Sequence, residues 1–307
     1  MARRRKGRTV NGLLILDKSA GMTSNGALQR AKRLFTAAKA GHTGSLDPLA
    51  TGVLPLCFGE ATKFSQFLLD ADKGYLSTIV LGIATDTADA DGQIIAQKEA
   101  TAVDAEAVRH AMTTLMGAIE QVPPMYSALK VDGQPLYKRA RAGEQIERAA
   151  RPVQIHRFDL VDFIAGEVAE ISTAVHCSKG TYIRALAEDL GAALNLPAHV
   201  KTLRRTQAGP FGLANAVTLT QLEAAMESGA EDRLDALLLP VDASLDHLPR
   251  VVLSEAATFY MRKGQTVLVP NGPRSGMVRI VDAGGAFLGV GKVQEEGAIA
   301  PVRLLAQ

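Results

Sequence analysis

Residues 41–55 read GHTGSLDPLATGVLP and place three glycines, a histidine, a serine and two threonines around one carboxylate, Asp47. Glycine allows backbone conformations that other residues avoid, and Pro48 biases Asp47 toward an extended conformation outside any helix. Leu46 and Leu49 are expected to tether this loop to the core. A carboxylate held on such a loop suits a nucleophile or a general base. An aspartate before proline also opens ordinary turns, so the local chemistry leaves both interpretations open.

The hydrophobic pattern on both sides of this loop predicts an α+β domain. Ser24 is expected to cap a helix after the first strand, and the Asp91-Gly92 turn predicts a hairpin. The sequence contains no glycine-rich nucleotide-binding motif, and its strands and helices do not alternate regularly. We therefore expect a mixed, mainly antiparallel sheet with flanking helices. Strands are expected at residues 12–17, 53–57, 75–81, 153–164 and 167–177, and helices at 103–116 and 182–190.

The chain of 307 residues is long enough for two domains. An acidic stretch at 221–250 ends at Pro249-Arg250. Beyond it, one helix and several short β-rich runs are separated by Gly, Pro and Asn turns. This pattern predicts a large domain at 1–248 and a small β-barrel-like domain at 249–307.

The composition excludes several classes of protein. Hydrophobic residues make up 47% of the chain and charged residues 21%, as in ordinary soluble globular proteins. Two cysteines, Cys57 and Cys177, are too few for a disulfide framework and fit a reducing compartment. The basic N-terminus precedes an apolar run too short for a signal peptide, and no stretch approaches 18 apolar residues. We expect a cytoplasmic protein with no membrane association.

Charge is distributed unevenly along the chain. Residues 1–41 contain ten Lys and Arg and one acidic residue, whereas residues 61–120 contain four bases and nine acids. Separate basic stretches can converge in a fold on one surface that binds a polyanion. They can equally be ordinary solvated faces and a basic tail, and charge alone does not decide. Further bases gather at Lys130, Lys138, Arg139 and Arg141, and at Lys201, Arg204 and Arg205.

A second candidate segment, residues 176–191, reads HCSKGTYIRALAEDLG and leads from a strand into a helix. Tyr182 and Arg184 would then lie in the first helical turn. The helix dipole disfavours a cation at that end, so Arg184 is expected to need a carboxylate or a phosphate as partner. A plain surface arginine is the alternative.

Other polar segments do not predict a metal site. Residues 85–92, TDTADADG, fit a calcium loop poorly, and a hairpin end with capping aspartates is the better interpretation. The histidines at 156, 176 and 199 lack metal-ligand spacing. Tyr75, taken by itself, is most simply a core aromatic at the end of a strand.

Taken together, the motifs resemble those of the bacterial tRNA pseudouridine-55 synthase (TruB) family. The resemblance spans residues 10–206 in order, so it is far more specific than any single motif. One departure is visible, because the family usually has Lys-Pro where this chain has Lys18-Ser19. That change affects only the local loop geometry. The matching blocks are residues 41–55, 58–75, 85–92, 121–144, 177–191 and 198–205.

The resemblance implies a role for six residues. Asp47 matches the essential catalytic carboxylate, and Arg184 matches its basic partner. Tyr75 matches the aromatic that packs on the target base and can assist its deprotonation. The remaining three match substrate-binding positions: His42 near the displaced base, and Tyr182 and Leu203 along the pocket.

The implied reaction is isomerisation of one uridine in the T-loop of tRNA, at position 55, to pseudouridine. The base must be flipped out, its bond to the sugar broken, and a carbon–carbon bond formed. Asp47 must be ionised, as an adjacent cation would favour, whether it attacks the anomeric carbon or removes the 2′ proton. No cofactor, metal or obligate protein partner is implied, and we expect a monomer. Residues 121–152 look like an insertion that grips RNA, and residues 249–307 resemble a PUA-type RNA-binding domain.

Two other functions are compatible with parts of the sequence. A non-catalytic tRNA-binding or RNA-folding protein could use the same surface, but the intact acidic signature argues against it. A hydrolase of nucleoside glycosidic bonds usually needs two carboxylates, and the 41–55 loop offers one.

Overall fold

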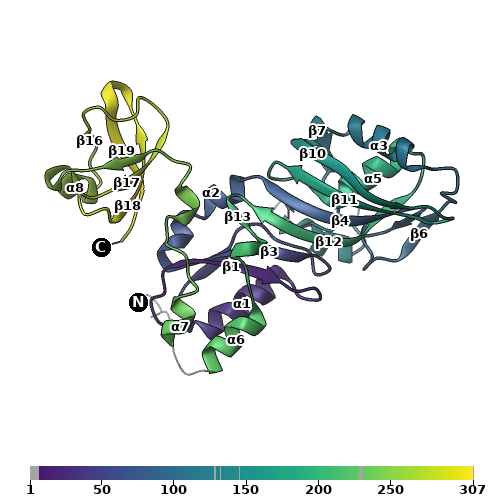
Figure 1. The fold of residues 1–307 in the computed structure, drawn as a ribbon, viewed down its shortest axis with the longest axis horizontal. Helices are drawn as coiled ribbons and strands as arrows, with labels where there is room; N and C mark the ends of the chain where they lie inside the picture. Colours follow the sequence, from purple (N-terminus) through teal and green to yellow (C-terminus); the bar gives the residue numbers. More distant parts are fainter. Residues whose placement is uncertain (1–6, 128, 132, 145, 228–230, 307) are drawn as a thin grey trace.

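The computed structural model describes residues 7–127, 129–131, 133–144, 146–227 and 231–306. The main body is built on a ten-stranded sheet, with most neighbours antiparallel (Figure 1). The prediction of a mixed, mainly antiparallel α+β fold is therefore confirmed. Its strands, in spatial order, are β14 (Val217–Thr218), β1 (Gly12–Lys18), β3 (Thr51–Phe58), β12 (Ala198–Ala208), β4 (Lys73–Leu81), β11 (Ala169–Cys177), β10 (Arg151–Ile164) and β7 (Gly117–Gln121), with β13 (Phe211–Gly212) beside β12 and β2 (Ala40–His42) beside β3.

Strands β1 and β3 are buried on both faces, which explains their unbroken apolar sequence. Leu14 and Leu16 pack into the core beneath the helices, whereas Leu13 and Ile15 face a second apolar cluster on the other side. The helices that flank the main body are α1 (Ser24–Leu34), α2 (Ser65–Asp70), α3 (Ala105–Thr114), α5 (Ile183–Ala193), α6 (Leu219–Glu227) and α7 (Glu231–Asp235), with short 3₁₀ turns at η1 (Gly59–Lys63), η2 (Leu213–Asn215) and η3 (Ala243–Leu245).

Strand β12 joins the two halves of the sheet. It runs antiparallel to β4 along nine paired residues, but it meets β3 only through Arg204 and Arg205, opposite Thr51 and Gly52. A side chain at Gly52 would place its Cβ 2.1 Å from the carbonyl oxygen of Arg205, and the φ angle there is +102°. Glycine is therefore required at this crossing, where the glycine-rich segment 41–55 enters the sheet.

The N-terminus of α1 differs from the prediction. Thr23, and not Ser24, is the cap, because its hydroxyl accepts a hydrogen bond from the backbone N–H of Gly26. Ser24 is the first helical residue and is buried. The predicted hairpin is present as β5 (Ile83–Thr85) and β6 (Ile94–Gln97).

Residues after Pro249 form a separate five-stranded sheet (Figure 1). Its order is β15 (Arg250–Val252), β17 (Met277–Val281), β18 (Phe287–Val293), β19 (Ala298–Leu304) and β16 (Val267–Leu268), with α8 (Glu255–Arg262) and the 3₁₀ turn η4 (Glu295–Gly297) beside it. This sheet contacts the main body through the rings of Phe64 and Phe287, whose centroids are 5.2 Å apart. The ammonium of Lys63 also donates to the carbonyl of Leu304 at 3.0 Å.

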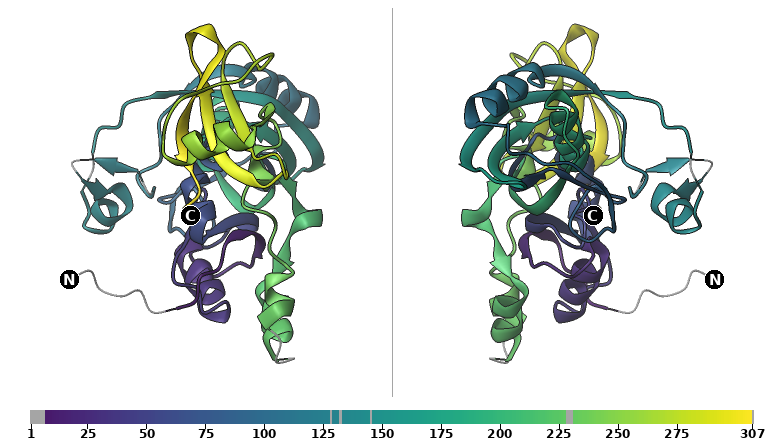
Figure 2. Two further views of the ribbon diagram at one scale, coloured as in Figure 1. Left: turned by 90° about the vertical axis from the view of Figure 1, so that its left-hand side faces the viewer. Right: turned by 90° about the vertical axis from the view of Figure 1, so that its right-hand side faces the viewer.

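The segment between β7 and β10 stands out from the body on one side (Figure 2). It contains β8 (Lys130–Val131), β9 (Gln134–Pro135) and α4 (Leu136–Arg141). Within the described ranges, no helix is both long and apolar enough to cross a membrane.

Candidate active site

A cavity of about 400 Å³ opens where β4, β12 and the start of α5 meet the loop that carries Asp47. Five of the six predicted site residues border it, namely Asp47, Tyr75, Tyr182, Arg184 and Leu203. His42 does not border this cavity. It lies on β2, and its Nδ1 is buried with no hydrogen-bond partner among the described residues.

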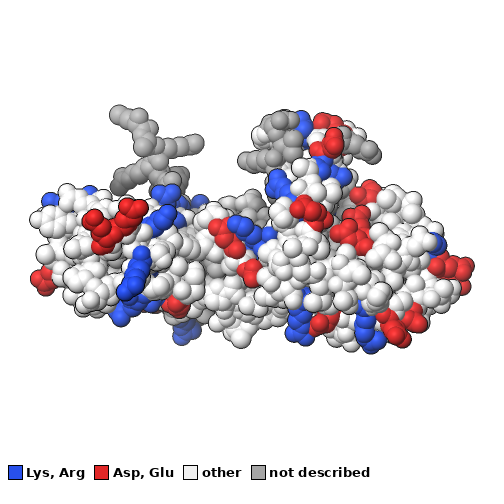
Figure 3. All heavy atoms as spheres, turned by 90° about the horizontal axis from the view of Figure 1, so that it is seen from above, with Lys and Arg blue, Asp and Glu red and all other residues white. Residues whose placement is uncertain are grey.

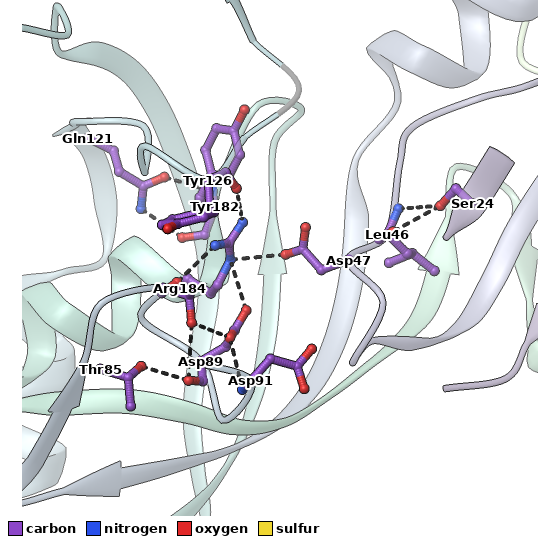
Figure 4. A network of polar contacts seen from close by, with 11 residues as sticks. Ser24, Leu46, Asp47, Thr85, Asp89, Asp91, Gln121, Tyr126, Tyr182 and Arg184 are labelled. Atoms are coloured by element: carbon purple, nitrogen blue, oxygen red, sulfur yellow. Dashed lines mark hydrogen bonds and ion pairs between the residues drawn. The ribbon is translucent and has the colours of Figure 1, made fainter. Parts of the chain in front are cut away.

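The loop that carries Asp47 is anchored from both sides. The Ser24 hydroxyl accepts from the Leu46 N–H at 2.7 Å and donates to the Leu46 carbonyl at 3.0 Å (Figure 4). The Leu46 side chain is buried in the core and Leu49 packs against it, as predicted. The Gly21 N–H donates to the Pro48 carbonyl at 2.9 Å. These contacts hold the backbone on both sides of Asp47, so its carboxylate is presented from a fixed position.

A buried lysine supports the same loop. Lys18 is fully buried, and its ammonium donates to the carbonyls of Ser19, Met22 and Pro48 at 2.9, 2.8 and 3.4 Å. Burial lowers the pKa of Lys18 to about 8, while the Asp47 carboxylate opposes this shift. Ser19 in place of proline leaves this hydrogen-bonding pattern intact, since the lysine uses only backbone oxygens.

Arg184 is the buried partner of Asp47. Its side chain is 4% exposed, and its Nε lies 2.9 Å from Asp47 Oδ2 (Figure 4). Its Nη1 donates to the Thr87 carbonyl at 2.9 Å, and its Nη2 donates to the Tyr126 carbonyl at 2.6 Å. The predicted anionic partner of Arg184 is thus a carboxylate, and the guanidinium is fixed in three directions.

A second carboxylate lies behind Arg184. Asp89 Oδ2 is 3.8 Å from Arg184 Nε, and this side chain is also buried. Asp89 Oδ1 accepts from the Thr87 hydroxyl and from the Asp91 N–H, at 2.6 and 3.1 Å. The 85–92 segment is thus the aspartate-capped turn that we predicted. It also delivers a backbone carbonyl and a carboxylate to the site, which the sequence did not indicate.

The start of α5 is held by the buried side chain of Gln121 at the end of β7. Its amide oxygen accepts from the Tyr182 N–H at 2.7 Å, and its amide nitrogen donates to the Tyr182 carbonyl at 3.1 Å (Figure 4). Tyr182 has an extended backbone and precedes the helix, whereas we predicted it within the first turn; Arg184 lies in that turn as predicted. The bonds to Gln121 therefore fix the point from which Arg184 projects.

Tyr75 and Leu203 come from neighbouring strands. Tyr75 lies opposite Arg205 in the β4–β12 pairing, and Leu203 lies opposite Ser77. Burial raises the pKa of the Tyr75 hydroxyl, and the nearby Arg205 guanidinium opposes the rise. Burial also lowers the pKa of His42, with a smaller contribution from Arg205.

Burial raises the pKa of the Asp47 carboxyl above its ordinary value, and Arg184 opposes this rise. Asp89 adds to the rise by repulsion between like charges. Arg184 thus stabilises the ionised form of Asp47, as we predicted from the sequence. Burial has the larger effect on the Asp47 pKa, in the opposite direction, and the prediction did not include it. Sequence alone could not supply that effect, because burial is set by the packing around the loop.

The raised pKa of Asp47 gives a testable pH dependence. If the ionised carboxylate is the active form, the reaction rate falls as the pH falls through this pKa. The acid limb of a single-turnover rate–pH profile should therefore begin at higher pH than an aspartate of pKa about 3.9 would give. Asp89→Asn removes a neighbouring negative charge and should move that limb to lower pH. A limb that stays in place in Asp89→Asn would contradict this electrostatic account.

The basic stretch at 201–205 is partly buried and partly paired with acidic residues. Arg205 is 1% exposed, Arg204 pairs with Asp17 at 2.7 Å, and Lys201 pairs with Glu170. Figure 3 shows Lys and Arg interspersed with Asp and Glu over the face drawn there. The basic residues 3–6 and the side chains of Lys130, Lys138 and Arg141 lie outside the described parts of the structure.

Sequence reasoning missed Lys18, Asp89, Gln121 and Arg205 as parts of the site. A lysine at the end of an apolar strand and a glutamine ending another strand were weak signals for two of them. Among the residues that the structure describes, no group of three or more His, Cys, Asp or Glu side chains could hold a metal ion.

The fold and the paired Asp47–Arg184 site define a class of protein, that of the pseudouridine synthases. A solved structure of similar fold is the crystal structure of a Cbf5-Nop10-Gar1 complex. It matches with a TM-score of 0.73 and 27% identity, covering 96% of this chain and 84% of the other. A second, an H/ACA RNP bound to a substrate RNA containing 2′-deoxyuridine, matches with a TM-score of 0.74 at 23% identity, covering 100% of this chain and 92% of the other.

The chain belongs to the TruB family of pseudouridylate synthases. The family model for the TruB N-terminal domain matches residues 32–183, and two TruB C-terminal models match residues 184–246 and 249–305. A tRNA pseudouridine synthase B from Pseudomonas aeruginosa (strain UCBPP-PA14) is 55% identical over 97% of each chain. The protein of the same description from Saccharophagus degradans is 51% identical over 99% of each chain. Membership makes the protein an isomerase.

Proposed function

We propose that this protein converts the uridine at position 55, in the T-loop of tRNA, to pseudouridine. The observation that supports this most directly is the Asp47 carboxylate, paired at 2.9 Å with a buried arginine and bordering a cavity. The relatives described as tRNA pseudouridine synthase B support the choice of substrate.

The chemistry assigned to the site follows from its groups. A uridine stacked in RNA hides its glycosidic bond, so the nucleotide must be flipped out, at a cost of a few kcal/mol. A loop is a suitable target because its bases can be splayed more easily than those of a duplex. Asp47 then acts at the sugar, either by attacking C1′ or by removing the 2′ proton, and Arg184 keeps its carboxylate ionised and oriented.

Tyr75, Tyr182 and Leu203 are proposed to surround the flipped base, because all three border the cavity beside Asp47. His42 is proposed to act from β2 at the displaced base, outside the cavity wall, when RNA is bound. Stacking of a base on an aromatic ring is worth about 1–3 kcal/mol. Tyr75 presents such a ring from β4, which pairs with β12, the strand that carries Leu203.

Substitution of Tyr75 tests the stacking role. Tyr75→Phe keeps the ring and should retain most of the single-turnover rate. Tyr75→Leu keeps an apolar side chain but loses the stack, which should lower the rate by roughly 5- to 150-fold, given about 1–3 kcal/mol per stacked base. Comparable, near-normal rates in the two variants would assign Tyr75 to the core instead.

The remaining regions are proposed to hold the RNA. The segment 121–152 projects beside the cavity, and its Ser127 and Leu129 border it, so it is placed to close over a bound T-loop. Domain 249–307 is proposed to be a PUA-like domain that adds RNA contacts, joined to domain 1–248 at Pro249. We further propose that the protein acts in the cytoplasm as a monomer, without a cofactor.

The decisive experiment uses purified protein and an unmodified tRNA transcript without additives. Pseudouridine at position 55, mapped by chemical probing, is the expected result, with Asp47→Ala as the inactive control. Binding of the transcript without pseudouridine formation would instead support a non-catalytic tRNA-binding protein. Release of free uracil would support a hydrolase.

A further inference from the structure

Three buried cations around the cavity have no carboxylate partner. Arg205, Lys18 and Lys73 are 1%, 0% and 7% exposed. Among the described residues, no carboxylate oxygen lies within 4 Å of their nitrogen atoms, and the groups that accept their hydrogen bonds are neutral, mainly backbone carbonyls. Arg205 and Lys73 border the cavity directly.

Arg205 is the most firmly placed of the three. Its Nε donates to the Val53 carbonyl at 2.6 Å, and its Nη2 donates to the Gly44 carbonyl at 3.1 Å. One bond reaches β3 and the other reaches the loop that carries Asp47. In the β4–β12 pairing Arg205 is opposite Tyr75, the residue proposed to stack on the base. Arg205 thus borders the cavity beside Tyr75.

This arrangement is costly unless an anion enters the cavity. A buried charge without a counter-ion carries a desolvation penalty of several kcal/mol. Burial lowers the pKa of Lys18 and of Lys73 to about 8, and Arg205 adds to both shifts by repulsion. The carboxylates nearest the cavity, Asp47 and Asp89, already face Arg184. Asp47 offsets part of the charge of Lys18, and Asp72 and Asp70 offset part of that of Lys73, but none of them pairs directly with these lysines or with Arg205. The site therefore holds more buried positive charge than its own carboxylates pair with.

The reaction supplies an anion at this place, and this step rests on the proposed function. When the C1′–N1 bond breaks, its electron pair leaves with the uracil ring, where N1, O2 and O4 share the charge. The ring then bonds to C1′ through C5. If Asp47 has attacked C1′, this step breaks the bond between C1′ and the Asp47 oxygen and regenerates the carboxylate; if Asp47 has removed the 2′ proton, that proton returns to C2′. The C5 proton is lost to solvent, and N1 gains a proton. The ring carries the charge whether Asp47 attacks C1′ or removes the 2′ proton, and no co-reactant is needed.

A phosphate of the RNA fits this position less well than the ring does. Arg205 is only 1% exposed, whereas a phosphate stays on the RNA backbone near the cavity mouth. The flipped base is the part of the substrate that reaches furthest into the protein. We propose that Arg205 is a further catalytic residue, whose guanidinium stabilises the negative charge on the detached uracil.

The first test measures single-turnover rates of pseudouridine formation in Arg205→Gln and Arg205→Lys. Loss of one fixed group that stabilises a developing anion typically costs on the order of 10²–10³ in rate, which is the expectation for Arg205→Gln. Arg205→Lys keeps a positive charge on a shorter, differently shaped side chain, so its rate should fall less than that of Arg205→Gln.

The affinity of both variants for tRNA should stay within about threefold of the normal value, since Arg205 is buried. Lys201→Gln, which removes a solvent-facing charge from the same strand, is the matched control and should keep the normal rate.

The second test separates charge stabilisation from loop positioning, since Arg205 also holds Gly44. A tRNA with 5-fluorouridine at the target has a ring that bears negative charge more easily, so it depends less on a nearby cation. The measured quantity is the loss of intact 5-fluorouridine after nuclease digestion. The rate penalty of Arg205→Gln should be at least about tenfold smaller on this substrate than on uridine. A purely positioning role predicts equal penalties on the two substrates and would overturn the proposal.

The two hypotheses fail in different ways. If the wild-type protein makes no pseudouridine, the proposed function is wrong. If the wild type is active and the Arg205 variants match it, only the role of Arg205 is wrong. Thermal melting reports whether Arg205→Gln folds. If Arg205→Gln does not fold, the two substrates are compared with Arg205→Lys instead. The rate penalty of Arg205→Lys must then also be smaller on 5-fluorouridine than on uridine.

Discussion

Asp47→Asn should reduce pseudouridine formation by at least about 10⁴-fold, as removal of an essential nucleophile or base does in other enzymes. The amide has nearly the shape of the carboxylate, so the loop anchored by Ser24 and Lys18 should keep its conformation. What is lost is the negative charge that either proposed role requires. Release of tritium from tRNA containing 5-tritiated uridine gives the rate, because the C5 proton is lost during isomerisation.

The variant should bind tRNA within a few-fold of the normal affinity, since Asp47 is one side chain within a large RNA interface. Asp91→Asn makes the matched control. Asp91 is an exposed aspartate near the site, and its backbone N–H, but not its side chain, bonds to Asp89. It should keep a rate within about twofold, as surface substitutions usually do. Turnover by pure Asp47→Asn above the background of the assay would rule out an essential role for the carboxylate.

Arg184→Lys should lower the single-turnover rate on the order of 10²–10³-fold, although the positive charge is retained. The guanidinium meets Asp47, the Thr87 carbonyl and the Tyr126 carbonyl through three different nitrogen atoms. A lysine ammonium is a single point of charge and cannot keep that geometry. Asp47 would then lose its orientation, and the neighbouring Asp89 would raise its pKa further.

Measuring the dissociation constant for tRNA tests the alternative that Arg184 binds the RNA backbone and does not position Asp47. With 4% of its side chain exposed, Arg184 should contribute little to binding, and the dissociation constant should change by less than about threefold. A variant with weakened binding and a normal rate at saturation would show that Arg184 is a phosphate contact. Arg184→Met removes the cation and leaves the Asp47 carboxylate unpaired, so it should also lower the melting temperature more than Arg184→Lys does.

The elements that sequence predicts well are those whose pattern is local. Strands β1 and β3 are continuous apolar runs, and α3 and α5 show helical spacing, so their positions were predicted within a few residues. Strand β12 was not predicted, because its sequence, AHVKTLRRTQA, is rich in charged and polar residues. Its place in the middle of the sheet is set by pairing with β4 and β3, which are distant in sequence.

The same limit applies to the site. The sequence identified Asp47 and Arg184, and it predicted an anion beside that arginine. The residues around Arg184 left open whether that anion is a carboxylate or a phosphate, and only the family resemblance paired the arginine with Asp47, because the 2.9 Å contact joins residues 137 positions apart. Arg205 was misjudged as a surface base for the same reason. Nothing in its immediate neighbours in the sequence shows that its side chain is buried.

The double hydrogen bond between Ser24 and Leu46 has a consequence for which uridines are accepted. The two bonds hold the backbone next to Asp47 against α1, so we expect the bound RNA, rather than this loop, to change shape when the two meet. A uridine in a flexible loop should then be modified faster than the same uridine within a long duplex. The fixed position of the backbone at Leu46 would thus favour target sites by their flexibility as well as by their sequence.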